Sequence, residues 1–300
     1  WPGGTKNTAW WKNISGLLTE VASGRFATPV RIEPNELRGG GKGLVEYGPQ
    51  TNFPSPWPGG EWRLRDIMDY ERIASDAILE TCAERRADFL RNALERARAA
   101  IATYSPRDGF RIPADQRDAA GAARLAALLA EHGVELVAAP NGDVYVPLAQ
   151  PYGRFVSELL TAQRYPETKL VPGKDIVRPY DVSAWTLPLM MGVTAERATL
   201  PPALAPWKAV APALPLDSSA VALAPGSPET SRLVNAGLRA GTARVARTAV
   251  SAGGREWPAG TVFLDGAAAK GAAAIAVPGQ AWTPVPAIPA ATEPLRAPRV

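Results

Sequence analysis

Apolar residues recur at the helical period between Trp62 and Thr103, and this pattern predicts one long helix or two abutting helices. Ile67, Ile78 and Cys82 fall on one apolar stripe, while charged residues fill the opposite face. Asp66 stands early in the helix, where an acidic side chain is favourable. Because Cys82 lies on the apolar stripe, we expect an inert thiol in the core.

A strand-helix-strand pattern occurs twice in the second part of the chain. The first copy, at about 109–148, has strand patterns on both sides of a helical pattern from Ala119 to Glu131. His132 and Gly133 then suit the end of that helix. The second copy, at about 220–264, begins and ends with strand patterns as well. Because parallel strands need a helical crossover, the repeat predicts a parallel or mixed α/β region.

The run from Ile14 to Val21 has the length and apolar content of a buried strand. Glu20 lies near its end, and a carboxylate is rarely buried unless it is paired. Two explanations are open from the residues alone. Glu20 is either a structural carboxylate paired with Arg25 or Arg31, or a group placed there for chemistry.

The segment 34–60 is rich in Gly, Pro and Asn, which predicts a long loop. Its Gly39-Gly40-Gly41-Lys42-Gly43 stretch lacks the spacing and the hydroxyl of a phosphate-binding loop, so a surface loop is the better interpretation. Further Pro/Ala-rich stretches cover 201–216 and 278–300.

Composition narrows the class of protein. The chain has 300 residues, 46% of them hydrophobic, which is enough for one large or two ordinary domains. The net charge of +4 is too small to predict nucleic-acid binding. No run reaches the length of apolar residues that a membrane helix needs, so we expect no membrane span.

The counts of histidine and cysteine limit the chemistry further. The chain has one His (His132) and one Cys (Cys82). A tetrahedral zinc site draws mainly on Cys and His, so these residues alone can hardly build one, and we assign no metal ligand. A catalytic triad could use only His132, whose position at a helix end has a structural explanation.

Several strings in the first hundred residues resemble the C-terminal end of a zinc carboxypeptidase domain of the carboxypeptidase A type. The resemblance covers residues 1–104 well and the remainder more loosely. It rests on the following strings: Gly3-Gly4-Thr5, Asn7-Thr8-Ala9-Trp10-Trp11-Lys12-Asn13, Gly16-Leu17-Leu18-Thr19-Glu20-Val21, Pro34-Asn35-Glu36-Leu37-Arg38-Gly39-Gly40-Gly41 and Arg63-Leu64-Arg65-Asp66-Ile67-Met68-Asp69-Tyr70. A later string resembles the α/β tail that follows the peptidase domain in a bacterial subgroup of this family: Arg178-Pro179-Tyr180-Asp181-Val182-Ser183-Ala184-Trp185.

The resemblance implies a fold and a site. Residues 1–104 would be the end of a mixed-sheet peptidase domain, and residues 105–300 an α/β tail containing the twofold repeat. Glu20 would be the general base, and Gly4 and Thr5 would shape the wall of the cleft. The family's zinc ligands, an H-x-x-E pair and a later histidine, would lie upstream, so the chain is expected to be a fragment that is inactive alone and leaves zinc to the missing region.

The expected activity is that of a metallocarboxypeptidase, a hydrolase that removes C-terminal residues from a peptide substrate. Relatives in this family tend to be exported, which implies a periplasmic or extracellular location. The alternative is a non-catalytic binding or interaction module derived from a peptidase, with the repeated tail as its functional part. Amidotransferase-like chemistry, found in similar tails, has no candidate nucleophile here beyond Cys82, which lies outside the tail.

Overall fold

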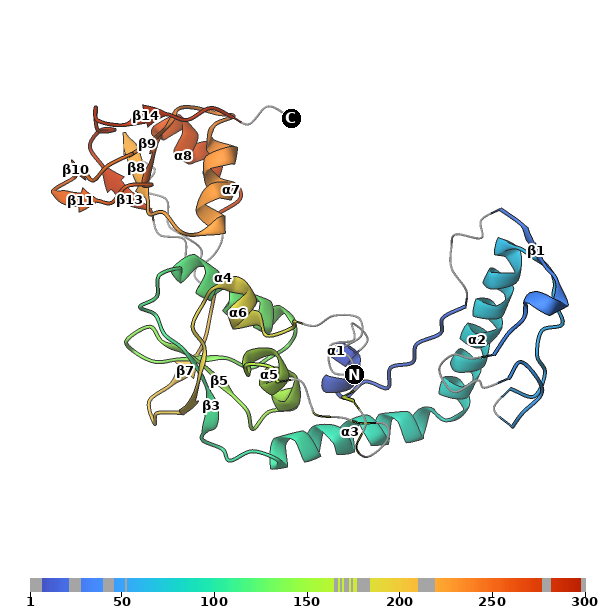
Figure 1. The fold of residues 1–300 in the computed structure, drawn as a ribbon. Coiled ribbons are helices and arrows are strands. Elements are labelled where there is room, and N and C mark those ends of the chain that lie inside the picture. Colours follow the sequence, from blue (N-terminus) through green and yellow to red (C-terminus); the bar gives the residue numbers. More distant parts are fainter. Residues whose placement is uncertain are drawn as a thin grey trace. The chain divides into compact units, whose positions relative to one another are not determined.

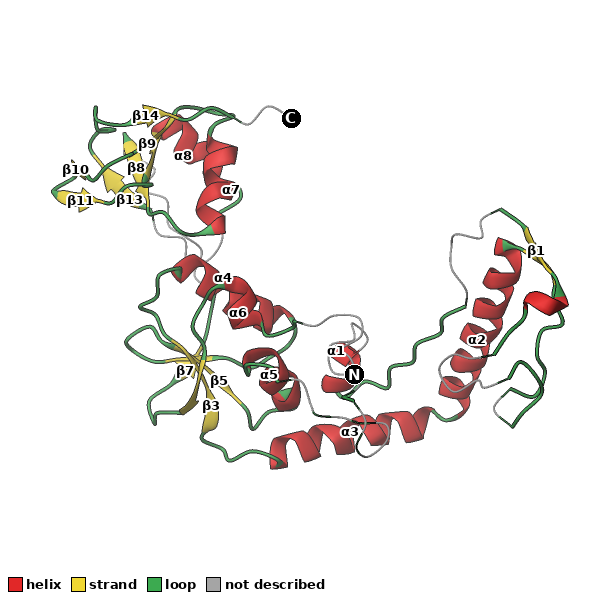
Figure 2. Ribbon diagram, viewed as in Figure 1, coloured by secondary structure: helices red, strands yellow, loops and turns green. Residues whose placement is uncertain are grey.

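The computed structural model describes residues 7–21, 28–39, 46–51, 53–164, 167, 169, 173, 175–176, 184–209, 219–276 and 282–297. Within these residues the chain is a mixed α/β protein with eight α-helices and several antiparallel sheets (Figure 1, Figure 2). It divides into two compact units. The smaller comprises residues 15–93, and the larger comprises residues 1–14 together with 94–300.

The smaller unit contains a two-stranded sheet and the helix that follows it. Strand β1 (Val30–Ile32) pairs antiparallel with β2 (Gly60–Trp62), and the short 3-10 helix η2 (Pro34–Glu36) follows β1. Helix α2 (Leu64–Glu84) starts directly after β2. The Asp66 carboxylate accepts a hydrogen bond from the Arg63 N–H at 2.8 Å, which satisfies a free donor at the helix start.

The predicted long helix is confirmed as two abutting helices. Helix α2 ends at Glu84, and α3 (Arg86–Ala102) begins after the single residue Arg85. The expectation for Cys82 was wrong, because its side chain is exposed near the end of α2. An amphipathic pattern predicts a helix and its apolar stripe, but it does not ensure that another element covers that stripe along its full length.

The strand predicted over residues 14–21 is also absent from the structure. Residues 14–21 have no regular secondary structure, and no strand of the described residues pairs with them. Ile14, Leu17 and Leu18 expose 52%, 72% and 57% of their surface. Glu20 is exposed too, so it is not a buried carboxylate as expected. An apolar run becomes a core strand only where neighbouring strands supply partners for its backbone.

The larger unit contains two five-stranded sheets. In the first, helices α4 (Ala119–Glu131), α5 (Gly153–Leu160) and α6 (Leu187–Met191) cover one face, and Leu125, Phe155 and Val146 are among the buried residues between helices and sheet. Its strands, in spatial order, are β6 (Glu196–Thr199), β3 (Asp108–Ile112), β5 (Val144–Pro147), β4 (Val137–Ala138) and β7 (Ala205–Pro206).

The second sheet is covered on both faces. Helices α7 (Pro228–Gly237) and α8 (Gly266–Ala273) pack on one face, as Figure 1 shows. A β-hairpin packs on the other and consists of β10 (Val250–Ala252) and β11 (Arg255–Trp257). The sheet strands, in spatial order, are β13 (Thr283–Val285), β8 (Ala220–Leu223), β12 (Val262–Asp265), β9 (Ala243–Val245) and β14 (Glu293–Pro294).

The two sheets have the same strand order. The strands β3, β4, β5, β6 and β7 of the first sheet take the places of β8, β9, β12, β13 and β14 in the second. The expected parallel or mixed pairing was wrong, since every described pair in both sheets is antiparallel. The physical reason is the position of β5. Helix α4 connects β3 to β4 along the chain, but β5 lies between these two strands in the sheet. β3 and β4 are both antiparallel to β5, so they run in the same direction with β5 between them. This is a split β-α-β arrangement, and β8, β12 and β9 repeat it.

Most local predictions in this unit are confirmed. Helix α4 has the predicted bounds, and β8 covers the predicted residues 220–223. Gly133 has a φ of 81°, the left-handed conformation that ends many helices, and His132 is the C-cap residue of α4. Helix α1 (Asn7–Trp11) belongs to this unit as well, because the Asn13 side chain donates a hydrogen bond to the Pro151 carbonyl at 2.7 Å.

Candidate functional site

An apolar cavity of the smaller unit lies between the β1–β2 sheet, helix α2 and the loop that precedes β2. Its volume is about 450 Å³, which is in the usual range for a small-molecule site. Aromatic side chains form much of the wall. The lining residues are Val21, Ile32, Leu37, Phe53, Ser55, Trp57, Trp62 and Tyr70.

The loop before β2 brings the two tryptophans together. Gly59 has a φ of 90°, and a Cβ at this position would lie 2.9 Å from the Ile32 carbonyl oxygen. Glycine therefore lets the chain turn tightly into β2 after Trp57. The Tyr47 hydroxyl donates a hydrogen bond to the Trp57 carbonyl at 2.7 Å and fixes the loop from the other side.

The aromatic rings meet at different angles. The ring centroids of Trp57 and Trp62 are 5.5 Å apart with planes at 66°, whereas Trp62 and Tyr70 stack at 5.8 Å and 26°. Phe53 meets Tyr47 edge to face at 5.5 Å. These separations are typical of favourable aromatic pairs, so the rings hold one another in place around the cavity.

Charged residues are sequence neighbours of several lining residues but are not themselves part of the described lining. Arg31 pairs with Glu33 at 2.7 Å, and Arg63 pairs with Glu61. The hydrogen bond from Arg63 lowers the pKa of Glu61, and that carboxylate is held in its charged form. At the end of the cavity near Val21, the Glu71 carboxylate accepts the Val21 N–H at 3.1 Å.

The structure places Glu20 directly before Val21, a lining residue of the aromatic cavity. Arg31 is paired with Glu33, and among the described residues Glu20 has no ion-pair partner. The structural explanation of Glu20 through Arg31 is therefore wrong. Arg25, Gly4 and Thr5 lie outside the described residues, as do Gly40–Gly43 and Arg178–Ser183.

No three His, Cys, Asp or Glu side chains come together in the part of the chain that the structure covers. His132 lies at the end of α4 with its ring 5.6 Å from that of Phe155, and Cys82 is exposed on α2. These groups do not fit a zinc ion, and we derive no metal-dependent step from them.

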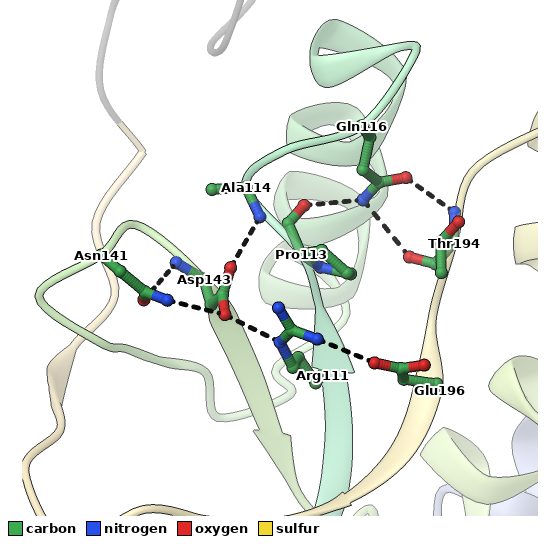
Figure 3. Close-up of polar contacts among 8 residues, drawn as sticks. All are labelled: Arg111, Pro113, Ala114, Gln116, Asn141, Asp143, Thr194 and Glu196. Atoms are coloured by element: carbon green, nitrogen blue, oxygen red, sulfur yellow. Dashed lines mark hydrogen bonds and ion pairs between the residues drawn. The ribbon is translucent and has the colours of Figure 1, made fainter.

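A cluster of polar side chains lies on the first five-stranded sheet of the larger unit (Figure 3). Arg111 on β3 lies between Asp143 and Glu196, with contacts of 2.7 and 2.9 Å. Asp143 also accepts hydrogen bonds from the Ala114 N–H at 2.8 Å and from Asn141 at 2.9 Å. Burial would raise the pKa of Asp143, but these hydrogen bonds outweigh it and the pKa lies below its usual value. A carboxylate so fully bonded serves the fold.

Gln116 completes this cluster and shows the same structural role. Its amide nitrogen donates to the Pro113 carbonyl at 2.8 Å, and its oxygen accepts the Thr194 N–H at 2.7 Å. The side chain thus ties the segment after β3 to the segment before β6 (Figure 3). Both ends of the amide are used within the fold, so Gln116 has a structural role.

The aromatic cavity was not predicted from the sequence. Its lining residues come from six separate places between Val21 and Tyr70, with no periodic spacing. The available signal was the density of aromatic residues in the Pro-rich loop, where Phe53 and Trp57 stand close to Trp62. Loops that carry large apolar side chains are often functional.

Comparisons of the chain with protein-family models, with curated proteins and with solved structures found no match. Among the described helices, none is long and apolar enough to cross a bilayer. The case for a function therefore rests on the residues and on the geometry of the cavity.

Proposed function

We propose that the chain is part of a metallocarboxypeptidase of the carboxypeptidase A type and that Glu20 is its general base. In this proposal the protein acts on peptides outside the cytoplasm, and zinc is held by polypeptide other than these residues. Support comes from the combined residue strings around Glu20 and from the position of Glu20 beside an apolar cavity. Gly4 and Thr5 would contribute to the cleft wall.

The observation that carries this proposal is the exposed apolar run that leads to Glu20. Leu17 and Leu18 leave most of their surface in water, although their pattern is that of a core strand. Contiguous exposed apolar side chains indicate a surface that another polypeptide covers. A peptidase domain that completes its sheet through residues 14–21 would bury these leucines and enclose Glu20.

The role of Glu20 follows from carboxylate chemistry. The carboxylate would take a proton from the attacking water as the water oxygen bonds to the peptide carbonyl carbon. The proton would then pass to the amide nitrogen as the peptide C–N bond breaks, which releases the amine and a carboxylic acid. Such a base works best where water is largely excluded. The exposed side chain of Glu20 does not have those surroundings in this chain, so the proposal requires the covering polypeptide to supply them.

The decisive experiment compares Glu20→Gln with Glu46→Gln in the protein that carries this chain together with its zinc-binding part. Release of C-terminal residues from peptides should be lost in Glu20→Gln, while zinc content and the activity of Glu46→Gln stay unchanged. Glu46 is an exposed glutamate of the same unit. Retained turnover in Glu20→Gln would show that the base is another residue.

A second experiment uses the 300-residue chain alone. Titration with zinc should find no stoichiometric tight site, and the chain should not hydrolyse peptides. Zinc-dependent peptidase activity of the isolated chain would contradict the proposal that the metal ligands lie elsewhere.

The second candidate function is a non-catalytic binding module. The specific observation in its favour is the aromatic cavity, whose described lining includes no nucleophile paired with a base. The neutral dye Nile red should bind there, and Ser55→Trp should block it because Ser55 is an exposed lining residue. Ser75→Trp on the exposed part of α2 is the matched control. Equal dye binding by both variants would rule out the cavity as the binding site.

A further inference from the structure

The aromatic cavity has the ring arrangement that attracts a cation. Trp57 and Trp62 form two walls at 66° to each other, and Tyr70 and Phe53 add further rings. The face of an aromatic ring carries partial negative charge, and tryptophan has the strongest effect. One face of Trp62 stacks on Tyr70, so a cation in the cavity would contact the rings on the faces that this pair leaves open.

The charges next to the lining residues have the matching sign. Six acidic residues and three arginines are immediate sequence neighbours of the lining residues Val21, Ile32, Leu37, Trp62 and Tyr70. The acidic neighbours are Glu20, Glu33, Glu36, Glu61, Asp69 and Glu71, and the basic ones are Arg31, Arg38 and Arg63. Glu33 and Glu61 pair with Arg31 and Arg63, and Asp69 pairs with Arg65 and Arg72. The carboxylate with a described contact to a lining residue is Glu71, which accepts the Val21 N–H at 3.1 Å. A carboxylate beside an apolar cavity raises the local concentration of cations.

The wall itself selects the kind of cation. None of the described lining residues is charged. The hydroxyls of Ser55 and Tyr70 are the hydrogen-bond acceptors among the lining side chains, since the indole N–H groups of Trp57 and Trp62 only donate. A small hydrated ammonium would lose its water and regain few hydrogen bonds in return. A cation that carries methyl groups has less hydration to lose and fills apolar space. Quaternary ammonium groups are recognised in this way by aromatic cages.

We propose that the cavity is a binding site for a quaternary or methylated ammonium group. Trp57 and Trp62 contact the cation with their ring faces, and Glu71 contributes charge at the end near Val21. The proposal extends the second candidate function by giving the ligand a chemical class. It does not depend on the peptidase role of Glu20.

The first test compares choline with its neutral carbon isostere, in which a tert-butyl group replaces the trimethylammonium group. The two ligands have the same shape, so calorimetric titration of the 300-residue chain isolates the effect of the charge. Choline should bind about tenfold more tightly than the isostere. Equal affinities would overturn the cation proposal but leave an apolar binding module, and no binding of either ligand would contradict both.

The second test changes the rings while keeping them aromatic. Trp57→Phe and Trp62→Phe should each weaken choline binding several-fold, because phenylalanine attracts a cation less strongly. Binding of the neutral isostere by the same variants should change less than twofold, which also shows that they are folded. Trp207→Phe in the larger unit is the matched control. Equal losses for both ligands would mean that the rings provide only apolar contact.

The third test removes a charge next to the cavity. Glu71→Gln keeps an oxygen that can accept the Val21 N–H but carries no charge. Choline affinity should fall and depend less on salt, while Glu80→Gln, on the exposed part of the same helix, should bind choline normally. An unchanged affinity in Glu71→Gln would remove Glu71 from the proposal.

The same titration distinguishes two sources of the ligand. Tighter binding of trimethyllysine amide than of choline would assign a modified lysine side chain, and the reverse order would assign a free choline-type molecule. Each result supports a methylated ammonium site, whereas failure of both ligands would overturn it.

Discussion

The two five-stranded sheets of the larger unit share their strand order but protect their second face in different ways. In the second sheet, the chain between β9 and β12 forms the hairpin β10–β11, which packs Trp257 against Phe263. In the first sheet, the chain between β4 and β5 is a short turn, and Arg111 lies across the face between two carboxylates. One face is covered by apolar side chains and the other by ion pairs.

Strand register shows which positions correspond. Ile112 pairs with Val144 in the first sheet, as Leu223 pairs with Val262 in the second. One residue earlier, Arg111 pairs with Tyr145, as Ala222 pairs with Phe263. The residue that turns away from the helices is therefore arginine in one sheet and alanine in the other.

This difference explains why one sheet needs a hairpin and the other does not. Ala222, Phe263 and Val285 would expose apolar surface if the hairpin were absent. Arg111 and Glu196 can face water without that cost. The same topology is thus compatible with a long connection that forms a hairpin or with a short turn. The hairpin goes with apolar side chains on the second face, and the short turn goes with charged ones.

The largest expected effect comes from placing the arginine of the first sheet into the second. Ala222→Arg would bury a guanidinium beneath the hairpin, where Trp257 and Phe263 offer no carboxylate. We expect a loss of about 4 kcal/mol or more in the free energy of unfolding, measured by urea denaturation. Ala198→Arg on the half-buried second face of the first sheet should cost clearly less. Similar losses in both variants would contradict the comparison.

Truncation of the hairpin tryptophan should have the next largest effect. Trp257 is 2% exposed and packs on the second sheet, and its ring N–H donates to the Ala252 carbonyl at 3.1 Å. Trp257→Ala should lower the free energy of unfolding by about 3–5 kcal/mol. Leu189→Ala, at an exposed apolar position, should change it by less than about 0.5 kcal/mol. A small effect of Trp257→Ala would mean that the hairpin contributes little to this sheet.

Local structure in these sheets could be predicted well from the sequence. The pattern of Ala119–Glu131 sets helix α4 because its apolar face is continuous, and the chain supplies residues suited to both ends. The Asp118 side chain accepts the Gly121 N–H at 2.8 Å, and Gly133 adopts the left-handed conformation. Such signals act over a few residues, so they can be recognised in a single sequence.

Pairing and burial could not be predicted in the same way. The pattern of a strand shows which side chains face the core, but not which strand lies beside it, so the position of β5 between β3 and β4 was missed. Residues 14–21 show the related difficulty, since an apolar run cannot indicate whether a partner is present. The aromatic cavity depends on rings that a loop brings together. Gly59 indicates a tight turn in that loop, but not which rings the turn places side by side.

A smaller effect is expected at the buried carboxylate of the first sheet. Asp143→Asn removes the charge that Arg111 and the Ala114 N–H stabilise, and should cost about 1–3 kcal/mol near pH 7. The pKa of Asp143 in the folded protein lies below its unfolded value of about 3.9, so its contribution is complete above that pH and is lost as the pH falls through the folded pKa. The difference between the two proteins should therefore narrow in unfolding experiments as the pH is lowered below the unfolded pKa of about 3.9.

The smallest expected effect concerns the exposed partner of Arg111. Glu196 has 53% of its side chain in water, whereas Asp143 has 5%, so water competes far more strongly for Glu196. Glu196→Gln should leave the urea midpoint unchanged within error. The midpoints of the variant and of the unmodified chain should also agree when salt is added. Asp143→Asn serves as the control in the same experiment, because its urea midpoint should be clearly lower. If Glu196→Gln destabilised the chain as much as Asp143→Asn, the two carboxylates would act as one network. The second face of the first sheet would then depend on both, as the second sheet depends on its hairpin.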